Sequence, residues 1–303
     1  MAPSKQARNI ALVGATGTIG APILTALLAA GHNVTVLTRP TSEATFPPSV
    51  TVHKGDYHSE SFTVFALKGV EVLILALSFN AYDAQIPLIR AAAQVGVKYI
   101  VPCEFGSDPT HPKLNAEISI MSMKAPFRNL IEELGVSSWV GIVNNPWVEF
   151  SLRLGLYGID LKSKTARFFD EGETKANFTT LTRVGESLAA LFALPEAELT
   201  AYKNQWVFTS SFYVSQKDFL ASAMRVTGTT KKDWTISKVP SDEIIAAAKK
   251  ETGQMAGAMA LFALVFKEGY GGDYDDKVLD YEALGLEPED LDAVMKSLAE
   301  EIK

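Results

Sequence analysis

The sequence predicts an α/β protein in which a doubly wound parallel sheet is followed by a smaller C-terminal lobe. Three observations support this fold class. Apolar, strand-like runs alternate with helical patterns over roughly the first half of the 303 residues. A turn with evenly spaced glycines follows the first of these runs. After residue 147 the alternation stops and the chain becomes rich in aromatic residues.

The glycine turn joins the first predicted strand to the first predicted helix. Residues 10–13 form a buried apolar run, and a helical pattern begins at Ile19 and ends before Gly31. Glycine lets backbone N–H groups approach a phosphate, the helix N-terminus favours negative charge, and two threonines add hydroxyl donors. The alternative is an ordinary tight turn, but we favour an NAD(P)-binding Rossmann fold. The cofactor contacts predicted on this turn are Gly14, Thr16, Gly17, Thr18, Ile19 and Gly20.

The second predicted strand, residues 34–38, ends in Arg39. In Rossmann folds that bind NAD, an acidic residue about 20 residues after the glycine turn binds the ribose 2′-hydroxyl. No carboxylate stands at this position. A guanidinium can instead pair with a 2′-phosphate, so the sequence predicts NADPH as the cofactor. The alternative is a solvated arginine at a strand end.

The alternation of strands and helices continues to residue 143. Further strands are predicted at residues 50–53, 70–77, 99–102 and 139–143, and helices at 59–67, 82–95 and 119–134. Ligands of open α/β sheets bind beyond the carboxyl ends of the strands. Residues at these ends are therefore predicted to contact the cofactor, namely Leu77, Ser78, Cys103 and Asn144.

The later half of the chain is predicted to form the lobe. Residues 147–180 are aromatic and irregular in pattern. Helices are expected at 184–194, 215–226, 241–251, 256–266 and 287–302, strands at 205–209 and 234–239, and a loop at 269–276. We expect residues 1–150 to form the NADPH-binding domain and residues 151–303 mainly a substrate-binding lobe, with some segments returning to the first domain. A cleft between them would hold the substrate, with predicted contacts from Phe105, Met123, Trp147, Phe150 and Phe169.

The composition argues against several classes of protein. The formal net charge of −7 offers no clustered positive charge for nucleic acid or an anionic membrane. Cys103 is the single cysteine, so no disulfide framework is expected, and the four histidines lack metal-ligand spacing. The start of the chain has no apolar signal segment, and residues 256–266 are about half as long as a membrane span. We therefore expect a cytoplasmic protein with a small-molecule substrate and no metal, and the oligomeric state stays open.

Several motifs resemble one known family. They are GATGTIG at residues 14–20, Arg39, QIPLI at 85–89, VPCEFGSD at 101–108 and MKAPFRNLIEELG at 123–135. Together they resemble the isoflavone reductase group of the NmrA-like, atypical short-chain dehydrogenase/reductase proteins, which includes pinoresinol-lariciresinol and phenylcoumaran benzylic ether reductases. The resemblance is strong over residues 10–145 and weaker beyond. It implies an NADPH-binding Rossmann domain with a small C-terminal substrate domain.

The same resemblance assigns a catalytic role to Lys124. The family's catalytic lysine lies in a K-A-x-x-R pattern, which residues 124–128 match. The chain departs from the family at Cys103, where serine is usual, and at Pro126, which falls inside the predicted helix. It also differs after Asn144, in a segment expected to set specificity. The class of activity therefore transfers better than the substrate.

Lys124 is also the best catalytic candidate from the residues alone. Its neighbours along the chain are largely apolar, and burial lowers the pKa of a lysine toward the working pH. Such a lysine can exchange a proton and hold the nicotinamide ribose. The alternative is a lysine whose amine reaches the surface. Ordinary short-chain dehydrogenases have a tyrosine four residues earlier, but Ile120 stands there, and Tyr213 with Lys217 repeats the spacing far from this helix.

The sequence thus predicts an NADPH-dependent reductase of a small, aromatic or conjugated molecule. Hydride would pass to an electrophilic carbon while Lys124 relays a proton. One alternative is a non-catalytic NADP sensor of the NmrA type that docks a partner protein, although a sensor needs no proton-transfer lysine. Another keeps the enzyme but uses the cofactor in an isomerisation without net redox change.

Overall fold

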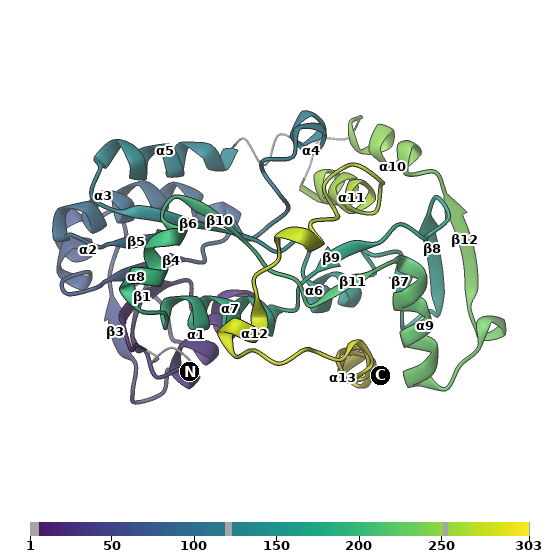
Figure 1. The fold of residues 1–303 in the computed structure, drawn as a ribbon, viewed down its shortest axis with the longest axis horizontal. Helices are drawn as coiled ribbons and strands as arrows, with labels where there is room; N and C mark the ends of the chain where they lie inside the picture. The colour runs from purple at the N-terminus through teal and green to yellow at the C-terminus, as the bar shows by residue number, and fades with distance from the viewer. Residues whose placement is uncertain (1–5, 119–122, 251–253, 303) are drawn as a thin grey trace.

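A seven-stranded parallel sheet is the largest of the three sheets in the computed structural model (Figure 1). The structure describes residues 6–118, 123–250 and 254–302. The strand order is β10-β6-β5-β4-β1-β2-β3. These strands are β1 (Asn9–Val13), β2 (Asn33–Thr38), β3 (Thr51–Lys54), β4 (Val72–Leu75), β5 (Tyr99–Val101), β6 (Ser138–Val143) and β10 (Gln205–Phe208). The chain changes direction across the sheet between β1 and β4, which is the point where such sheets bind ligands. The predicted Rossmann fold is confirmed.

Helices cover both faces of this sheet. One face carries α1 (Gly20–Ala29) and α7 (Leu181–Phe192), and the other carries α2 (Glu60–Ala66), α3 (Gln85–Val95) and α5 (Ala125–Leu134). Within β1, Ile10 and Leu12 pack with the first set of helices, while Ala11 and Val13 pack with the second. Because side chains on a strand alternate between faces, a strand covered on both sides must be apolar throughout. This explains the continuous apolar runs in the sequence.

The lobe follows the carboxyl end of β6 and contains two smaller sheets. One has the order β12-β8-β7, and the other pairs β11 with β9. Their strands are β7 (Ile159–Asp160), β8 (Thr165–Phe169), β9 (Ala176–Phe178), β11 (Phe212–Val214) and β12 (Thr235–Val239). The remaining helices are α4 (Pro112–Glu117), α6 (Val148–Arg153), α8 (Glu196–Leu199), α9 (Gln216–Thr227), α10 (Ser241–Ala248), α11 (Gln254–Val265), α12 (Tyr281–Leu284) and α13 (Leu291–Ile302). Of these, α8 and α12 belong with the large sheet, because Leu199 and Leu284 pack on its α1 and α7 face.

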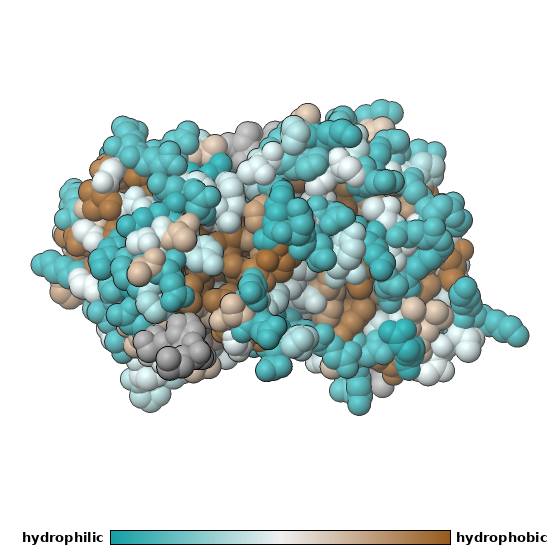
Figure 2. Space-filling model, in the orientation of Figure 1, coloured by the Kyte–Doolittle hydropathy of each residue, from teal (hydrophilic) through white to brown (hydrophobic). Residues whose placement is uncertain are grey.

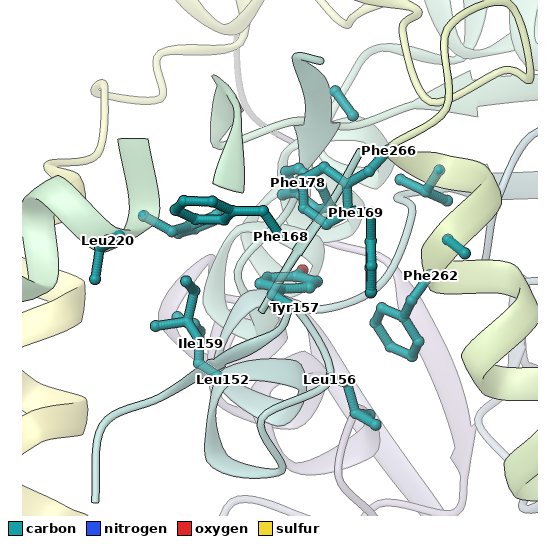
Figure 3. Packing of buried hydrophobic residues seen from close by; sticks show 14 of the residues in the cluster. Leu152, Leu156, Tyr157, Ile159, Phe168, Phe169, Phe178, Leu220, Phe262 and Phe266 are labelled. Carbon is teal, nitrogen blue, oxygen red and sulfur yellow. The ribbon is translucent and has the colours of Figure 1, made fainter. Parts of the chain in front are cut away.

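Tyr157 lies at the centre of the lobe core (Figure 3). Its ring is stacked on Phe219 at 4.9 Å and lies 4.8 Å from Phe178. Phe262 and Phe266 approach its edges from α11 and the residue after it. Aromatic rings bury large areas, so this cluster supplies much of the lobe's hydrophobic stabilisation.

Two later elements return to the large sheet. β10 pairs with β6, with Val207 opposite Ile142, and becomes an edge strand. Helix α7, which comes earlier in the chain, packs beside α1 on one face of the sheet. The chain therefore passes from the sheet into the lobe and back, and the domain boundary at residue 150 stays a prediction.

The aromatic stretch at 147–180 is not irregular, contrary to our expectation. It contains α6 and the strands β7, β8 and β9. These elements have two to six residues each, which is too short for a periodic pattern to stand out.

The boundaries near the site also need correction. The predicted helix at 119–134 begins at Ala125, so Pro126 lies in its first turn, where proline is compatible with a helix. Residues 119–122 lie outside the described residues. A helix that was not predicted, α4, precedes them and is capped by His111. The helix predicted from Tyr82 begins at Gln85, after the 3-10 helix η1 (Phe79–Ala84).

Candidate active site

The glycine turn has one position that the fold leaves open. A Cβ on Gly14 would lie 2.2 Å from the Ala76 carbonyl oxygen, and one on Gly20 would lie 2.0 Å from the Gly14 oxygen. Both glycines are therefore required by the packing of the chain itself. A Cβ on Gly17 would come only within 3.3 Å of the Gly14 oxygen, and this residue is exposed between Thr16 and Thr18. The Gly17 N–H donates to the Gly14 oxygen at 2.9 Å, so what Gly17 offers a ligand is a close approach to the turn without a side chain in the way.

The N-terminus of α1 suits an anion. Its N-cap residue is Ile19, and no side chain caps the helix. The first N–H groups of a helix lack partners within the helix, and its dipole favours negative charge there. The residues present therefore fit a pyrophosphate at this turn.

Arg39 follows β2 at the same edge of the sheet. β1 and β2 are in register with Val13 opposite Leu37, so Arg39 comes level with the glycine turn. Its side chain is exposed and makes no ion pair with any described residue. A guanidinium in this position can reach a phosphate on the ribose.

Cys103, which follows β5, forms hydrogen bonds with the backbone at the end of β4. Its thiol donates to the Leu75 carbonyl at 3.0 Å and accepts from the Leu77 N–H at 3.3 Å. Burial raises the pKa of this thiol to about 12, so it stays protonated. The sulfur therefore already has hydrogen-bond partners within the chain. Ser78, at the same edge of the sheet, is exposed.

Lys124 is buried immediately before α5. Its side chain is 6% exposed, and Nζ donates to the backbone carbonyl of Glu104 in the loop after β5. Burial lowers the pKa of this lysine, Glu104 and Cys103 act in the opposite direction, and Arg128 adds to the lowering. The alternative of an amine at the surface is wrong. Met123, by contrast, is 59% exposed.

Two buried polar side chains lack partners where β6 ends. Asn144 is fully buried, and neither atom of its amide has a hydrogen-bond partner among the described residues. The Ser107 hydroxyl is in the same situation. The bridge between Gly106 and Val143 places these two residues side by side. Since burying such groups without partners is costly, they are suited to a polar ligand. The sequence analysis missed Ser107, and its position in the loop after β5 was the available signal.

The predicted substrate contacts do not all come together. Trp147 and Phe150 meet edge to face at 5.9 Å at the start of α6, and both are partly exposed. Phe105 is half-buried in the loop after β5. Phe169 is only 3% exposed and packs against Phe266 in the lobe core (Figure 3), so it has no open face for a ligand. Figure 2 shows apolar side chains at the surface in the middle of the molecule, between the sheet and the lobe.

Comparison with known proteins identifies the family. The model of the NmrA-like family matches residues 6–154. Oxidoreductase aprR of Aspergillus flavus is 30% identical over 306 aligned positions, which cover 96% of this chain and 98% of that protein. The chain belongs to the NmrA-like family. The family predicted from the sequence motifs is thus confirmed.

Other similar proteins have lower sequence identity. A phenylcoumaran benzylic ether reductase of Ginkgo biloba is 26% identical over 191 positions, covering 58% of this chain and 62% of that protein. The solved structure of an isoflavone reductase superposes with a TM-score of 0.79 at 21% identity, covering 96% and 99% of the two chains. AtPrR2, solved with NADP+ and (+)pinoresinol, gives 0.78 at 20%, covering 97% and 99%. At these identities the structures establish the shared fold.

Two negative findings concern the described residues only. No three or more His, Cys, Asp or Glu side chains there lie close enough to hold a metal ion. No helix in the same ranges has both the length and the apolar character needed to cross a bilayer.

Proposed function

We propose that this NmrA-like protein is an NADPH-dependent reductase of a small, aromatic or conjugated molecule, with Lys124 as the proton-transfer residue. Its relatives are named oxidoreductases and reductases, and NADP+ or NADPH is present in neighbouring solved structures. The enzyme class and the cofactor follow from these relationships. The substrate class and the role of Lys124 are our inference.

The residues at the sheet edge can be assigned to parts of the cofactor. The open backbone at Gly17 and the N-terminus of α1 would hold the pyrophosphate, and Arg39 would bind the 2′-phosphate. The side-chain amide of Asn144, which has no partner among the described residues, would form hydrogen bonds with the nicotinamide end of NADPH. Bound NADPH supplies the hydride. Trp147 and Phe150 would hold the substrate through ring contacts.

The burial of Lys124 is the observation that carries the proposal. The lowered pKa increases the share of Lys124 that is present as the neutral amine, and the amine and the ammonium together can accept and return a proton. The hydrogen bond from Nζ to the Glu104 carbonyl holds this group at the loop after β5, beside the predicted nicotinamide position. Water has little access to a side chain this buried.

The test is a single-turnover measurement of hydride transfer at saturating cofactor, in which the absorbance of NADPH is the readout. (+)Pinoresinol and an isoflavone are the first probes, because related structures concern these compounds. Lys124→Ala should lower the rate about 100-fold or more, the scale of general acid-base catalysis, and Lys124→Arg should restore little, because a guanidinium does not release its proton. Lys98→Ala is the matched control, since Lys98 is exposed at the opposite end of β5.

A wild-type rate in Lys124→Ala would remove the proposed role of this lysine. The sensor alternative would then be tested by partner capture with NADP+ and with NADPH. Substrate turnover without consumption of NADPH would instead indicate an isomerisation.

A further inference from the structure

A buried ion pair lies next to Lys124. The Glu104 side chain is 3% exposed and that of Arg128 is 14% exposed, and Nη1 of Arg128 pairs with Oε1 of Glu104. The guanidinium also lies 4.6 Å from the ring centre of Trp206 on β10 and 5.8 Å from that of Trp139 on β6. An arginine held between a carboxylate and two aromatic rings is fixed in position.

Glu104 contacts both cations at the start of α5, but with different atoms. Its side chain pairs with Arg128, and its backbone carbonyl accepts from Lys124 Nζ. Residues 124 and 128 lie one helical turn apart, so the two cations face the same part of the loop. Glu104 thus contacts both cations, one through its backbone and the other through its carboxylate.

Glu104 and Arg128 act in opposite directions on the charge of Lys124, which burial already disfavours. A buried carboxylate near an ammonium stabilises the charged form, and a nearby guanidinium destabilises it. If Arg128 were absent, the Glu104 carboxylate would be buried without a partner, which is strongly unfavourable. The Lys124 ammonium, which donates to the backbone carbonyl of the same residue, would then be available as a counter-ion.

We propose that Arg128 is a positioning residue for Lys124. By holding the Glu104 carboxylate, it prevents that carboxylate from becoming the counter-ion of the lysine, so that Lys124 can release its proton. This inference deepens the proposed function, and its catalytic consequence rests on that function. The effect of the Glu104–Arg128 ion pair on the protonation of Lys124 can be measured whether or not the protein turns over a substrate.

Two other titratable groups lie near Glu104, and burial raises the pKa of both. Cys103 lies on the same loop as Glu104, and burial raises the pKa of its thiol to about 12. The Tyr82 hydroxyl, from η1, donates to the Cys103 carbonyl at 2.8 Å, and burial raises the pKa of this phenol as well. Burial is the largest influence on the Lys124 pKa; among the neighbouring groups Glu104 raises it most, Cys103 raises it less, and Arg128 lowers it.

The experiment measures the titration of Lys124 directly in the full chain without substrate. Lysine labelled with ¹³C at Cε is followed by NMR as the pH is changed, and the Lys124 signal is assigned by its loss in Lys124→Arg. Arg128→Met should move the titration midpoint to higher pH, because the freed Glu104 carboxylate stabilises the ammonium. Arg128→Lys keeps a positive charge and should stay closer to wild type. The double variant Glu104→Gln/Arg128→Met should return the midpoint below that of Arg128→Met, while retaining the backbone acceptor of Lys124.

Arg153→Met is the control for loss of an arginine ion pair elsewhere. Arg153 pairs with Glu301 at 2.7 Å on the surface, and its loss should leave the Lys124 midpoint unchanged. An unchanged midpoint in Arg128→Met, or a double variant as high as the single one, would overturn the proposal. If Arg128→Met does not fold, Glu104→Gln decides, since it should lower the midpoint and an unchanged midpoint refutes the idea.

The outcome is separable from the test of the proposed function. A wild-type hydride-transfer rate in Lys124→Ala would end the catalytic role of Lys124 without changing the expected order of NMR midpoints. Conversely, the Lys124 midpoint could be the same in all variants while Lys124→Ala transfers hydride slowly. That result would support the proposed reductase and refute the role of Arg128.

Discussion

Replacement of Gly17 tests whether the glycine turn is a phosphate site. The three glycines of the turn differ in how close an added Cβ would come to neighbouring atoms. At Gly14 and Gly20 an added Cβ would collide with backbone oxygens at 2.2 Å and 2.0 Å. At Gly17 the nearest atom would be the Gly14 oxygen at 3.3 Å, followed by the Ala76 oxygen at 3.9 Å, and the backbone is not left-handed. Gly17 is therefore the position where a side chain disturbs a ligand more than the fold.

The magnitudes follow from these contacts. Gly17→Ala should change the free energy of unfolding by about 1 kcal/mol or less, because a shift of a few tenths of an ångström relieves the contact. The added methyl would occupy the space through which a pyrophosphate approaches the turn. Losing one charge-assisted hydrogen bond costs about 1.5 to 3 kcal/mol, or about 10- to 100-fold in the NADPH dissociation constant. Gly17→Val, with a branched side chain, should abolish binding.

The assay combines NADPH titration by calorimetry with thermal unfolding of the ligand-free protein. Gly17→Val should unfold within a few degrees of wild type and bind no NADPH, whereas Gly20→Ala should lose stability because the Gly14 backbone must move. A folded Gly17→Val protein with wild-type affinity for NADPH would refute the phosphate site. A variant that does not fold would show that Gly17 serves the fold itself.

Three further predictions concern charge and burial at the site. Arg39→Glu should weaken NADPH by about 1.5 to 3 kcal/mol while changing NADH much less, and equal affinities for NADPH in titrations of wild type and variant would refute the 2′-phosphate contact. Asn144→Leu should leave the ligand-free protein as stable in urea as wild type, because its amide has no partner there, but should weaken NADPH; a large loss of stability would contradict this. Because burial lowers the pKa of Lys124, the unfolded chain keeps this proton to higher pH than the native state, so stability should rise with pH between the two pKa values. Lys124→Met should remove that rise in urea unfolding curves, and the same slope in both proteins would be the contrary result.

The Rossmann half could be predicted because its signals are local. Each strand is a short apolar run. The helix ends have typical capping residues, such as Ser59 at the start of α2 and the left-handed Gly96 at the end of α3. The glycine turn and Arg39 lie at the ends of adjacent strands, so the parallel order of the sheet brings them together. Predicting the cofactor site needed little more than the strand order.

The lobe and the last strand of the sheet depend on contacts between distant residues. β10 joins β6 by pairing Val207 with Ile142, and nothing within residues 205–208 distinguishes this edge from a strand of the lobe. Phe169 and Phe150 are both aromatic, yet the first is in the core and the second is 38% exposed. Burial of this kind is set by the tertiary fold, so the sequence could not separate core rings from substrate-facing rings.

The start of α5 links the sequence to the proposed chemistry. Proline is compatible with a helix in its first turn, and Pro126 accordingly stands next to the first helical residue, Ala125. This leaves Lys124 at the N-cap, a position that usually carries Ser, Thr, Asp or Asn, and where the helix dipole disfavours a positive charge. A lysine there contributes nothing to the helix, and its burial is unfavourable as well. Both effects favour the neutral amine, so the departure from the family's pattern at Pro126 is consistent with a proton-transfer role for Lys124.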